Sequence, residues 1–142
     1  MRDEQYTPKS LFSQMAVNFD LDVCAPEGGI DWIPADKHFS LKDDALNQEW
    51  KGFVWMNPPY SKPAPWVDKF IENGHGIALL PMSKSNWSMK LWNAADAISF
   101  IGTMKFVQPN GLFSQIYMPV LLYGIGCHGV RGITNAATNR VR

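Results

Sequence analysis

The sequence has few cysteines and no long apolar run, and each deficit excludes a class of protein. Only two of 142 residues are cysteine, Cys24 and Cys127. They form no C-x-x-C pair, so neither a disulfide framework nor a thiolate zinc site is indicated, and buried thiols are expected. The longest apolar stretch, 118–122, contains Pro119 and is far shorter than the roughly 20 residues of a membrane-spanning helix. The charged N-terminus has no apolar run behind it, so we expect no signal peptide and a cytoplasmic protein.

Acidic residues are absent from the last third of the chain. The formal net charge is zero, but residues 1–50 carry ten acids and four bases, whereas residues 97–142 carry four bases and no acid. This distribution is compatible with an acidic small-molecule pocket in the first third and an anion-facing surface later. Chance together with a solvated basic tail explains the charges equally well.

The order of predicted elements is typical of an α/β protein. Helical spacing of apolar residues predicts helices over about 8–18, 66–74 and 87–95. Strands are predicted over 19–25, 52–56, 77–80 and 98–101, then as a hairpin of 104–107 and 115–123 around Pro109-Asn110-Gly111. Residues 30–50 show only a short helical turn near 43–46. We expect one compact domain over 1–142, with a mostly parallel central sheet, a C-terminal hairpin and a tail that frays after Gly124.

Two chemically unusual loops follow predicted strands. One is Cys24 to Gly29, and the other begins at Asn57-Pro58-Pro59-Tyr60. Ligands of parallel sheets bind at the carboxyl ends of the strands, so both loops are expected at one site.

The sequence Asn57-Pro58-Pro59-Tyr60 combines hydrogen-bond acceptors with an aromatic ring. The two prolines fix φ and remove two donors, which leaves a stiff turn with outward-facing carbonyls. The Asn57 amide oxygen and the Pro58 carbonyl can then accept hydrogen bonds from one amino group, beside the flat face of Tyr60. These features indicate a pocket for a planar heterocycle that bears an exocyclic amine.

Met56-Asn57-Pro58-Pro59-Tyr60-Ser61 resembles the catalytic motif of the amino-group DNA methyltransferases, in the form typical of adenine-specific enzymes. Further elements match in order: Tyr6-Thr7-Pro8-x-x-Leu11-Phe12, Leu21-Asp22-Val23-Cys24-Ala25, Asp43-Asp44-Ala45-Leu46 before Trp50, and Leu79-Leu80-Pro81 before Trp87. Over most of residues 5–122 the chain is similar to the small Dam-like N6-adenine methyltransferases of phages and prophages. It departs from them in the cofactor loop, where Ala25-Pro26-Glu27-Gly28-Gly29 replaces the usual Gly-x-Gly.

This resemblance implies a Rossmann-like fold and methyl transfer from S-adenosylmethionine to the N6 amino group of adenine in DNA. The implied catalytic residues are Asn57, Pro58, Pro59 and Tyr60. The implied cofactor-binding residues are Tyr6, Thr7, Pro8, Asp22, Cys24, Ala25, Asp44 and Asn57. DNA, with the target adenine flipped from the duplex, is expected to contact Tyr60, Ser61, Lys62 and Lys84. No metal is implied, and we expect a monomer or homodimer in the host cytoplasm.

Two alternatives stay open. The same chemistry can act on RNA or on a protein glutamine, or the chain can be a degenerate relative that binds cofactor or DNA without catalysis. The altered glycine loop and the short chain favour degeneracy, whereas the intact Asn57–Ser61 motif opposes it. Single residues also have structural explanations: Asp44 as a helix N-cap, the lysines as solvated side chains, and Trp66, Trp87 and Trp92 as core.

Overall fold

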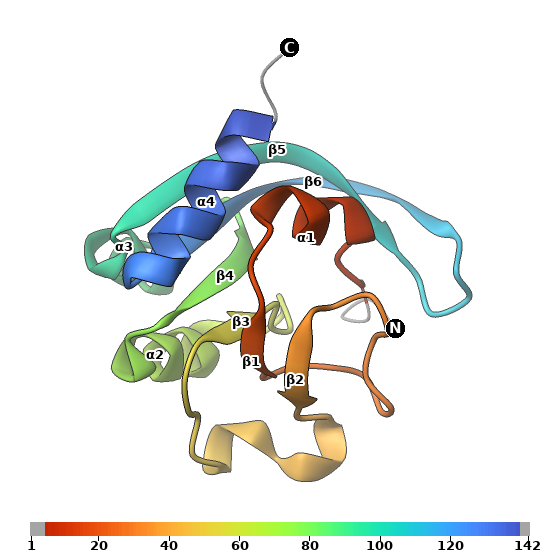
Figure 1. The fold of residues 1–142 in the computed structure, drawn as a ribbon, viewed down its shortest axis with the longest axis horizontal. Coiled ribbons are helices and arrows are strands. Elements are labelled where there is room, and N and C mark those ends of the chain that lie inside the picture. Colours follow the sequence, from red (N-terminus) through yellow and green to blue (C-terminus); the bar gives the residue numbers. More distant parts are fainter. Residues whose placement is uncertain (1–4, 140–142) are drawn as a thin grey trace.

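The structure, a computed structural model, describes residues 5–139 (Figure 1). The charged residues 1–4 and the basic residues Arg140 and Arg142 lie outside this range. The elements in chain order are α1 (Lys9–Met15), β1 (Phe19–Asp22), β2 (Ala35–His38), the 3₁₀ turns η1 (Leu41–Asp43) and η2 (Ala45–Asn47), β3 (Val54–Met56), α2 (Ala64–Asn73), β4 (Gly76–Pro81), α3 (Asn86–Ala94), β5 (Ala97–Val107), β6 (Phe113–Ile125) and α4 (Cys127–Asn139). Within the described residues, no helix is long and apolar enough to cross a membrane.

The six strands form one mixed sheet in the order β2-β1-β3-β4-β6-β5. Strands β2, β1, β3 and β4 are mutually parallel, and β6 runs antiparallel to both β4 and β5. The α/β class is therefore confirmed. The expectation of a mostly parallel sheet holds only for the first four strands, because the long antiparallel pairings of β6 contain most of the paired residues.

Helices cover both faces of this sheet and produce two apolar cores (Figure 1). Helices α1 and α4 contribute Leu11, Phe12, Met15, Ile133 and Ala136 to one core. Helices α2 and α3 contribute Val67, Phe70 and Leu91 to the other. Strand β4 lies between the cores and alternates between them, with Ile77 and Leu79 on the α1–α4 side and Ala78 and Leu80 on the α2–α3 side. Its continuous apolar run reflects burial on both faces.

Several elements differ from their predicted form. Strand β5 is one continuous strand where two are predicted, because Gly102, at φ +85°, allows a register shift without ending the strand. Strand β2 is not predicted at all. It is an edge strand with mostly exposed side chains, so no apolar pattern marks it.

Two expectations of burial are also wrong. Trp66 and Trp87 do pack against the α2–α3 core, but Trp92 is 55% exposed on the outer side of α3. Cys24 is half-buried, whereas Cys127 is exposed in the first turn of α4, and the two cysteines form no disulfide with each other.

The segment after Gly124 forms helix α4 instead of a fraying tail. Its buried Ile133 and Ala136 complete the α1–α4 core, and the Asn135 side chain donates a hydrogen bond to the Met15 carbonyl at 2.9 Å. Gly129 brings the helix close to the sheet, since a Cβ there would lie 2.9 Å from the Gly76 carbonyl oxygen. The glycines that suggest a loose tail therefore form a packing surface.

A valine at position 129 tests this close packing. We expect Gly129→Val to lower the free energy of unfolding by about 1–3 kcal/mol, because its side chain must displace backbone rather than a flexible side chain. Thr134→Val, at an exposed position of the same helix, serves as the matched control. Urea unfolding of both variants measures the effect, and equal stabilities would contradict the packing of α4 on the sheet.

Candidate active site

The candidate site lies where the topology of the sheet reverses. The chain continues from β1 to its neighbour β2 on one side and later adds β3 on the other side of β1. The carboxyl ends of β1 and β3 are thus the switch point at which open α/β sheets bind ligands. Asp22 ends β1, opposite Trp55 of β3, and Asn57 follows β3 directly. Both predicted loops therefore meet at one edge, as expected.

Asn57 is bound to the N-terminal segment, not only to its own loop. Its side-chain nitrogen donates to the Gln5 carbonyl and to the Thr7 hydroxyl, each at 3.1 Å. The Gln5 carbonyl can only accept, so this contact determines which end of the amide is the nitrogen. The Oδ1 atom must then point away from the N-terminal segment. Within residues 5–139, no hydrogen bond to Asn57 Oδ1 or to the Pro58 carbonyl is found.

Thr7 is the most buried of the residues implied for the cofactor on this segment, at 1% exposure. Its carbonyl accepts a hydrogen bond from the Trp32 indole at 2.8 Å, while its hydroxyl accepts from Asn57. Both contacts hold the segment in place over the end of β3. Tyr6 next to it exchanges two backbone hydrogen bonds with Val107 at the end of β5.

Tyr60 is anchored at its hydroxyl. The hydroxyl donates to the Leu79 carbonyl at 3.3 Å, and the ring meets Phe106 edge-on at a centroid distance of 6.2 Å. Burial raises the pKa of this hydroxyl well above its ordinary value, and charge repulsion from Cys24 adds to the shift. The Cys24 thiol therefore influences the pKa of the Tyr60 hydroxyl. The sequence does not suggest that Phe106, on a later strand, contacts Tyr60. Leu79 belongs to the element that resembles the family, but the sequence assigns it no contact with Tyr60.

Asp22 is a buried acid at the end of β1, with 3% exposure. Burial raises its pKa from 3.8 to about 7, although a hydrogen bond from the Cys24 backbone nitrogen to Oδ1, at 3.2 Å, acts in the opposite direction. A buried carboxyl costs stability, so its place at a switch point indicates a functional role.

Gln5 adds an acceptor that sequence reasoning missed. Its side-chain oxygen is buried and has no hydrogen-bond partner, while its backbone carbonyl binds Asn57. Buried polar atoms normally have partners, so an unsatisfied acceptor on the segment that contacts Asn57 suits a ligand that donates. Nothing in the sequence distinguishes Gln5 from a surface glutamine.

Charge divides this edge of the sheet into two halves. Residues 23–34 and 39–47, which follow β1 and β2, carry four acids, Glu27, Asp31, Asp43 and Asp44, and one base, Lys42. The loops 57–63, 82–85 and 108–112, which follow β3, β4 and β5, contain Lys62 and Lys84 and no acid. The anion-facing surface expected from residues 97–142 stays a prediction, since Arg140 and Arg142 lie outside the described residues.

The structure does not place every residue implied by the family resemblance beside Asn57, Tyr60 and Asp22. Asp44 is exposed and accepts a hydrogen bond from Asn47 at 2.6 Å, which accounts for its carboxylate locally. Ala25 is buried, and its backbone nitrogen binds the Phe39 carbonyl at 2.8 Å. The exposed residues of the implied DNA set are Ser61, Lys62 and Lys84. Pro58 is buried, Pro59 is half-buried, and Pro8 precedes α1.

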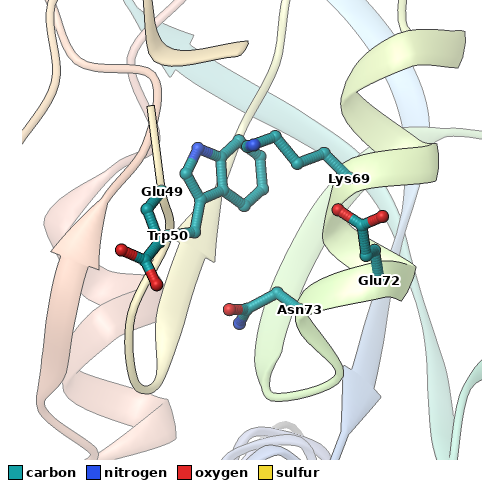
Figure 2. Close-up of a pocket in the computed structure, with 5 residues that line it drawn as sticks. All are labelled: Glu49, Trp50, Lys69, Glu72 and Asn73. Carbon is teal, nitrogen blue, oxygen red and sulfur yellow. The ribbon is translucent and has the colours of Figure 1, made fainter. Parts of the chain in front are cut away.

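A cavity of about 250 Å³ lies elsewhere, between the segment before β3 and the end of α2 (Figure 2). It is lined by Glu49, Trp50, Lys69, Glu72 and Asn73. The Lys69 ammonium lies 5.5 Å from the centre of the Trp50 ring. These residues precede β3 and β4, so the cavity is at the opposite edge of the sheet from Asn57 and contains none of the predicted site residues.

Comparison with known proteins identifies related sequences. The family model described as DNA N-6-adenine-methyltransferase (Dam) matches residues 1–113. A DNA N-6-adenine-methyltransferase of Haemophilus phage HP1 is 38% identical over 56 residues, which is 39% of this chain and 31% of that protein. One of Escherichia phage T1 is 32% identical over 109 residues, 69% of this chain and 44% of that protein. The chain thus spans less than half the length of either relative.

The buried carboxyl of Asp22 predicts a specific pH dependence of stability. Its pKa is near 7 in the folded protein and near 3.8 in the unfolded chain, so its protonated form favours folding at low pH. This contribution is lost as the pH rises from about 4 to about 7. Asp22→Asn cannot ionise and is expected to be more stable than the wild type at pH 8, by about 4 kcal/mol, and nearly equal to it at pH 4.

Urea titrations across this pH range measure the difference. Asp36→Asn, an exposed acid on the neighbouring strand β2, is the control and should follow the wild type. A wild type and Asp22→Asn with parallel pH profiles would contradict a buried, protonated Asp22.

Proposed function

Because the chain belongs to the DNA N-6-adenine-methyltransferase (Dam) family, we propose that it transfers a methyl group from S-adenosylmethionine to the N6 amino group of adenine in DNA. The orientation of the Asn57 amide carries this proposal. Its nitrogen is bound to Gln5 and Thr7, so its oxygen is left as an acceptor in the same loop as the Pro58 carbonyl. Two adjacent acceptors match the two protons of an exocyclic amine.

The wider architecture supports the same proposal. Parallel strands with a switch point between β1 and β3, helices on both faces and a final antiparallel hairpin are compatible with a Rossmann-like methyltransferase fold over residues 1–142. A monomer or homodimer acting in the cytoplasm of a phage host belongs to the same proposal, since both relatives are phage proteins.

The residues at this edge of the sheet fit a cationic cofactor. S-adenosylmethionine carries an ammonium and a sulfonium group. The Asp22 carboxyl at the end of β1 and the unpartnered side-chain oxygen of Gln5, whose backbone contacts Asn57, are acceptors for such groups. A bound cation lowers the pKa of a neighbouring carboxyl, so Asp22 would ionise when the cofactor binds. Tyr6, Thr7 and Pro8 would flank one side of the ligand. On the other side, Cys24 and Ala25 would lie close to it, and Asp44 further along the edge.

The chemistry assigned to the protein is mainly alignment and charge stabilisation. The bound cofactor supplies an activated methyl group on a sulfonium. The adenine amino nitrogen is a weak nucleophile, because its lone pair is delocalised into the ring. Hydrogen bonds from its two protons to Asn57 Oδ1 and to the Pro58 carbonyl localise this lone pair and stabilise the positive charge that develops on nitrogen. S-adenosylmethionine held at this edge would supply the methyl group to the adenine nitrogen, and the amino group would release one proton to solvent.

Tyr60 would hold the base in this geometry. Its hydroxyl contact with Leu79 and its edge contact with Phe106 restrict the ring, which leaves its face for stacking with a base flipped from the duplex. Ser61, Lys62 and Lys84 lie on the half of the edge without acids, where the loops can contact phosphates.

Cofactor binding and methyl transfer on one set of samples test the proposal. We expect calorimetry to show micromolar binding of S-adenosylmethionine, on the order of −8 kcal/mol. Asn57→Ala should keep this affinity within a few-fold but lose methyl transfer to DNA by roughly 100-fold or more, because the acceptor acts mainly in the transition state. RNA and glutamine-containing peptides serve as competing acceptors. A folded Asn57→Ala protein that stays fully active would refute the role of Asn57, and a folded wild type without cofactor binding would favour the degenerate alternative.

Thr7 is expected to act through Asn57 as a positioning residue. Thr7→Val keeps the buried volume but removes the acceptor for the Asn57 nitrogen, so the amide is held by Gln5 alone. We expect kcat to fall about 10-fold with little change in cofactor affinity, whereas Thr7→Ser keeps the hydroxyl and most of the activity. A raised cofactor Kd with unchanged kcat in Thr7→Val would instead assign Thr7 to direct cofactor binding.

A further inference from the structure

The last two strands extend beyond the rest of the sheet as an arm. Strand β4 ends at Pro81, which is paired with Val120 of β6. Beyond that pair, β5 and β6 continue together to the loop at residues 108–112 (Figure 1). Because β6 is antiparallel to both neighbours, β5 runs parallel to β4. The arm, residues 102–119, therefore projects past the carboxyl edge that carries Asn57, by roughly 20 Å for six residues of strand.

The arm is fixed beside the candidate site. Phe106, on the arm, is buried and contacts the ring of Tyr60. Val107, next to it, exchanges backbone hydrogen bonds of 2.7 and 2.8 Å with Tyr6. The arm is thus held by the same N-terminal segment that orients Asn57, and its position relative to the Asn57–Tyr60 loop is determined on two sides.

The tip of the arm is a closed turn that exposes two apolar side chains. The Gln108 nitrogen donates to the Leu112 carbonyl at 2.9 Å, and the Leu112 nitrogen donates to Asn110 Oδ1 at 3.0 Å. Leu112 is nevertheless 65% exposed and Phe113 is 59% exposed. A well-bonded turn with large apolar residues in water suits a surface that is covered by a partner.

We infer that Leu112 and Phe113 form a wedge that enters the base stack of duplex DNA when the target adenine leaves it. This inference rests on the proposed function. Proteins that unstack DNA insert leucine or phenylalanine side chains between base steps, and a two-stranded ribbon fits the major groove. The neighbouring loops favour DNA as the partner, since loops 57–63 and 82–85 contain Lys62 and Lys84, and neither they nor loop 108–112 contains an acid.

The position of the wedge explains how it can serve Tyr60. Phe106, which contacts Tyr60, and Leu112 at the tip are separated along the arm by a few residues, a distance on the order of 10 Å. Extrusion moves the base out of the stack and leaves a gap in the duplex, and the tip would fill this gap while the base lies on Tyr60. Filling that gap would remove the penalty for leaving it open.

The test compares paired and unpaired target adenines. One substrate is a long mixed-sequence duplex. In the second, part of the thymine in one strand is replaced by uracil and then converted to abasic sites, so many adenines have no partner base. Labelled cofactor measures methyl transfer by the wild type, by Leu112→Ser/Phe113→Ser and by the conservative Leu112→Met/Phe113→Leu. Leu41→Ser, at a leucine that is 96% exposed on the acidic half of the edge, is the matched control.

We expect the double serine variant to lose about 10-fold or more on the intact duplex but at most 2- to 3-fold on the abasic duplex. The conservative variant and Leu41→Ser should follow the wild type on both substrates. Thermal unfolding and cofactor calorimetry should be unchanged in all variants, since both side chains are exposed.

Other outcomes overturn the inference in distinguishable ways. Equal losses on both substrates would assign the tip to general DNA affinity. Unchanged methyl transfer with reduced self-association in sedimentation would assign it to a second copy of the chain. A wild type that methylates neither DNA would instead refute the proposed function, and the wedge with it.

Discussion

The arrangement of the site depends on the two hydrogen bonds from the Asn57 side-chain nitrogen to Gln5 and Thr7. They join segments about 50 residues apart in sequence and assign the amide its direction, because a backbone carbonyl can only accept. The same N-terminal segment binds Val107 at the end of β5. The N-terminal segment therefore orients the Asn57 amide and also holds the arm in place.

The groups whose burial lowers the stability of the fold lie near the carboxyl ends of β1 and β3. Asp22 is buried with a pKa near 7, and the Gln5 side-chain oxygen is buried without a partner. Elsewhere the protein is packed closely, with apolar cores on both faces of the sheet and glycine contacts between α4 and the strands. Unsatisfied or strained groups in an otherwise consistent fold are expected where a ligand supplies the missing interaction.

Much of the architecture follows from local sequence signals. The apolar run of β4, the stop of α2 at Gly74 and the turn at Asn110-Gly111 have short-range causes in burial, left-handed glycine conformation and turn chemistry. Elements that depend on distant partners were missed or misjudged. Strand β2 pairs only with β1 and has no apolar pattern, and α4 is stabilised by the sheet that its glycines approach.

The sequence by itself determined the chemistry of Asn57-Pro58-Pro59-Tyr60, because two prolines and an amide define a stiff, acceptor-rich turn wherever they occur. It also determined that this turn follows one strand of an α/β protein and that Asp22 lies in another. Only the tertiary structure decided which way the Asn57 amide points, that Gln5 and Phe106 join the site, and that an arm with an apolar tip lies beside it. These features arise from contacts between residues far apart in the chain, and no local pattern encodes which distant backbone a side chain will meet.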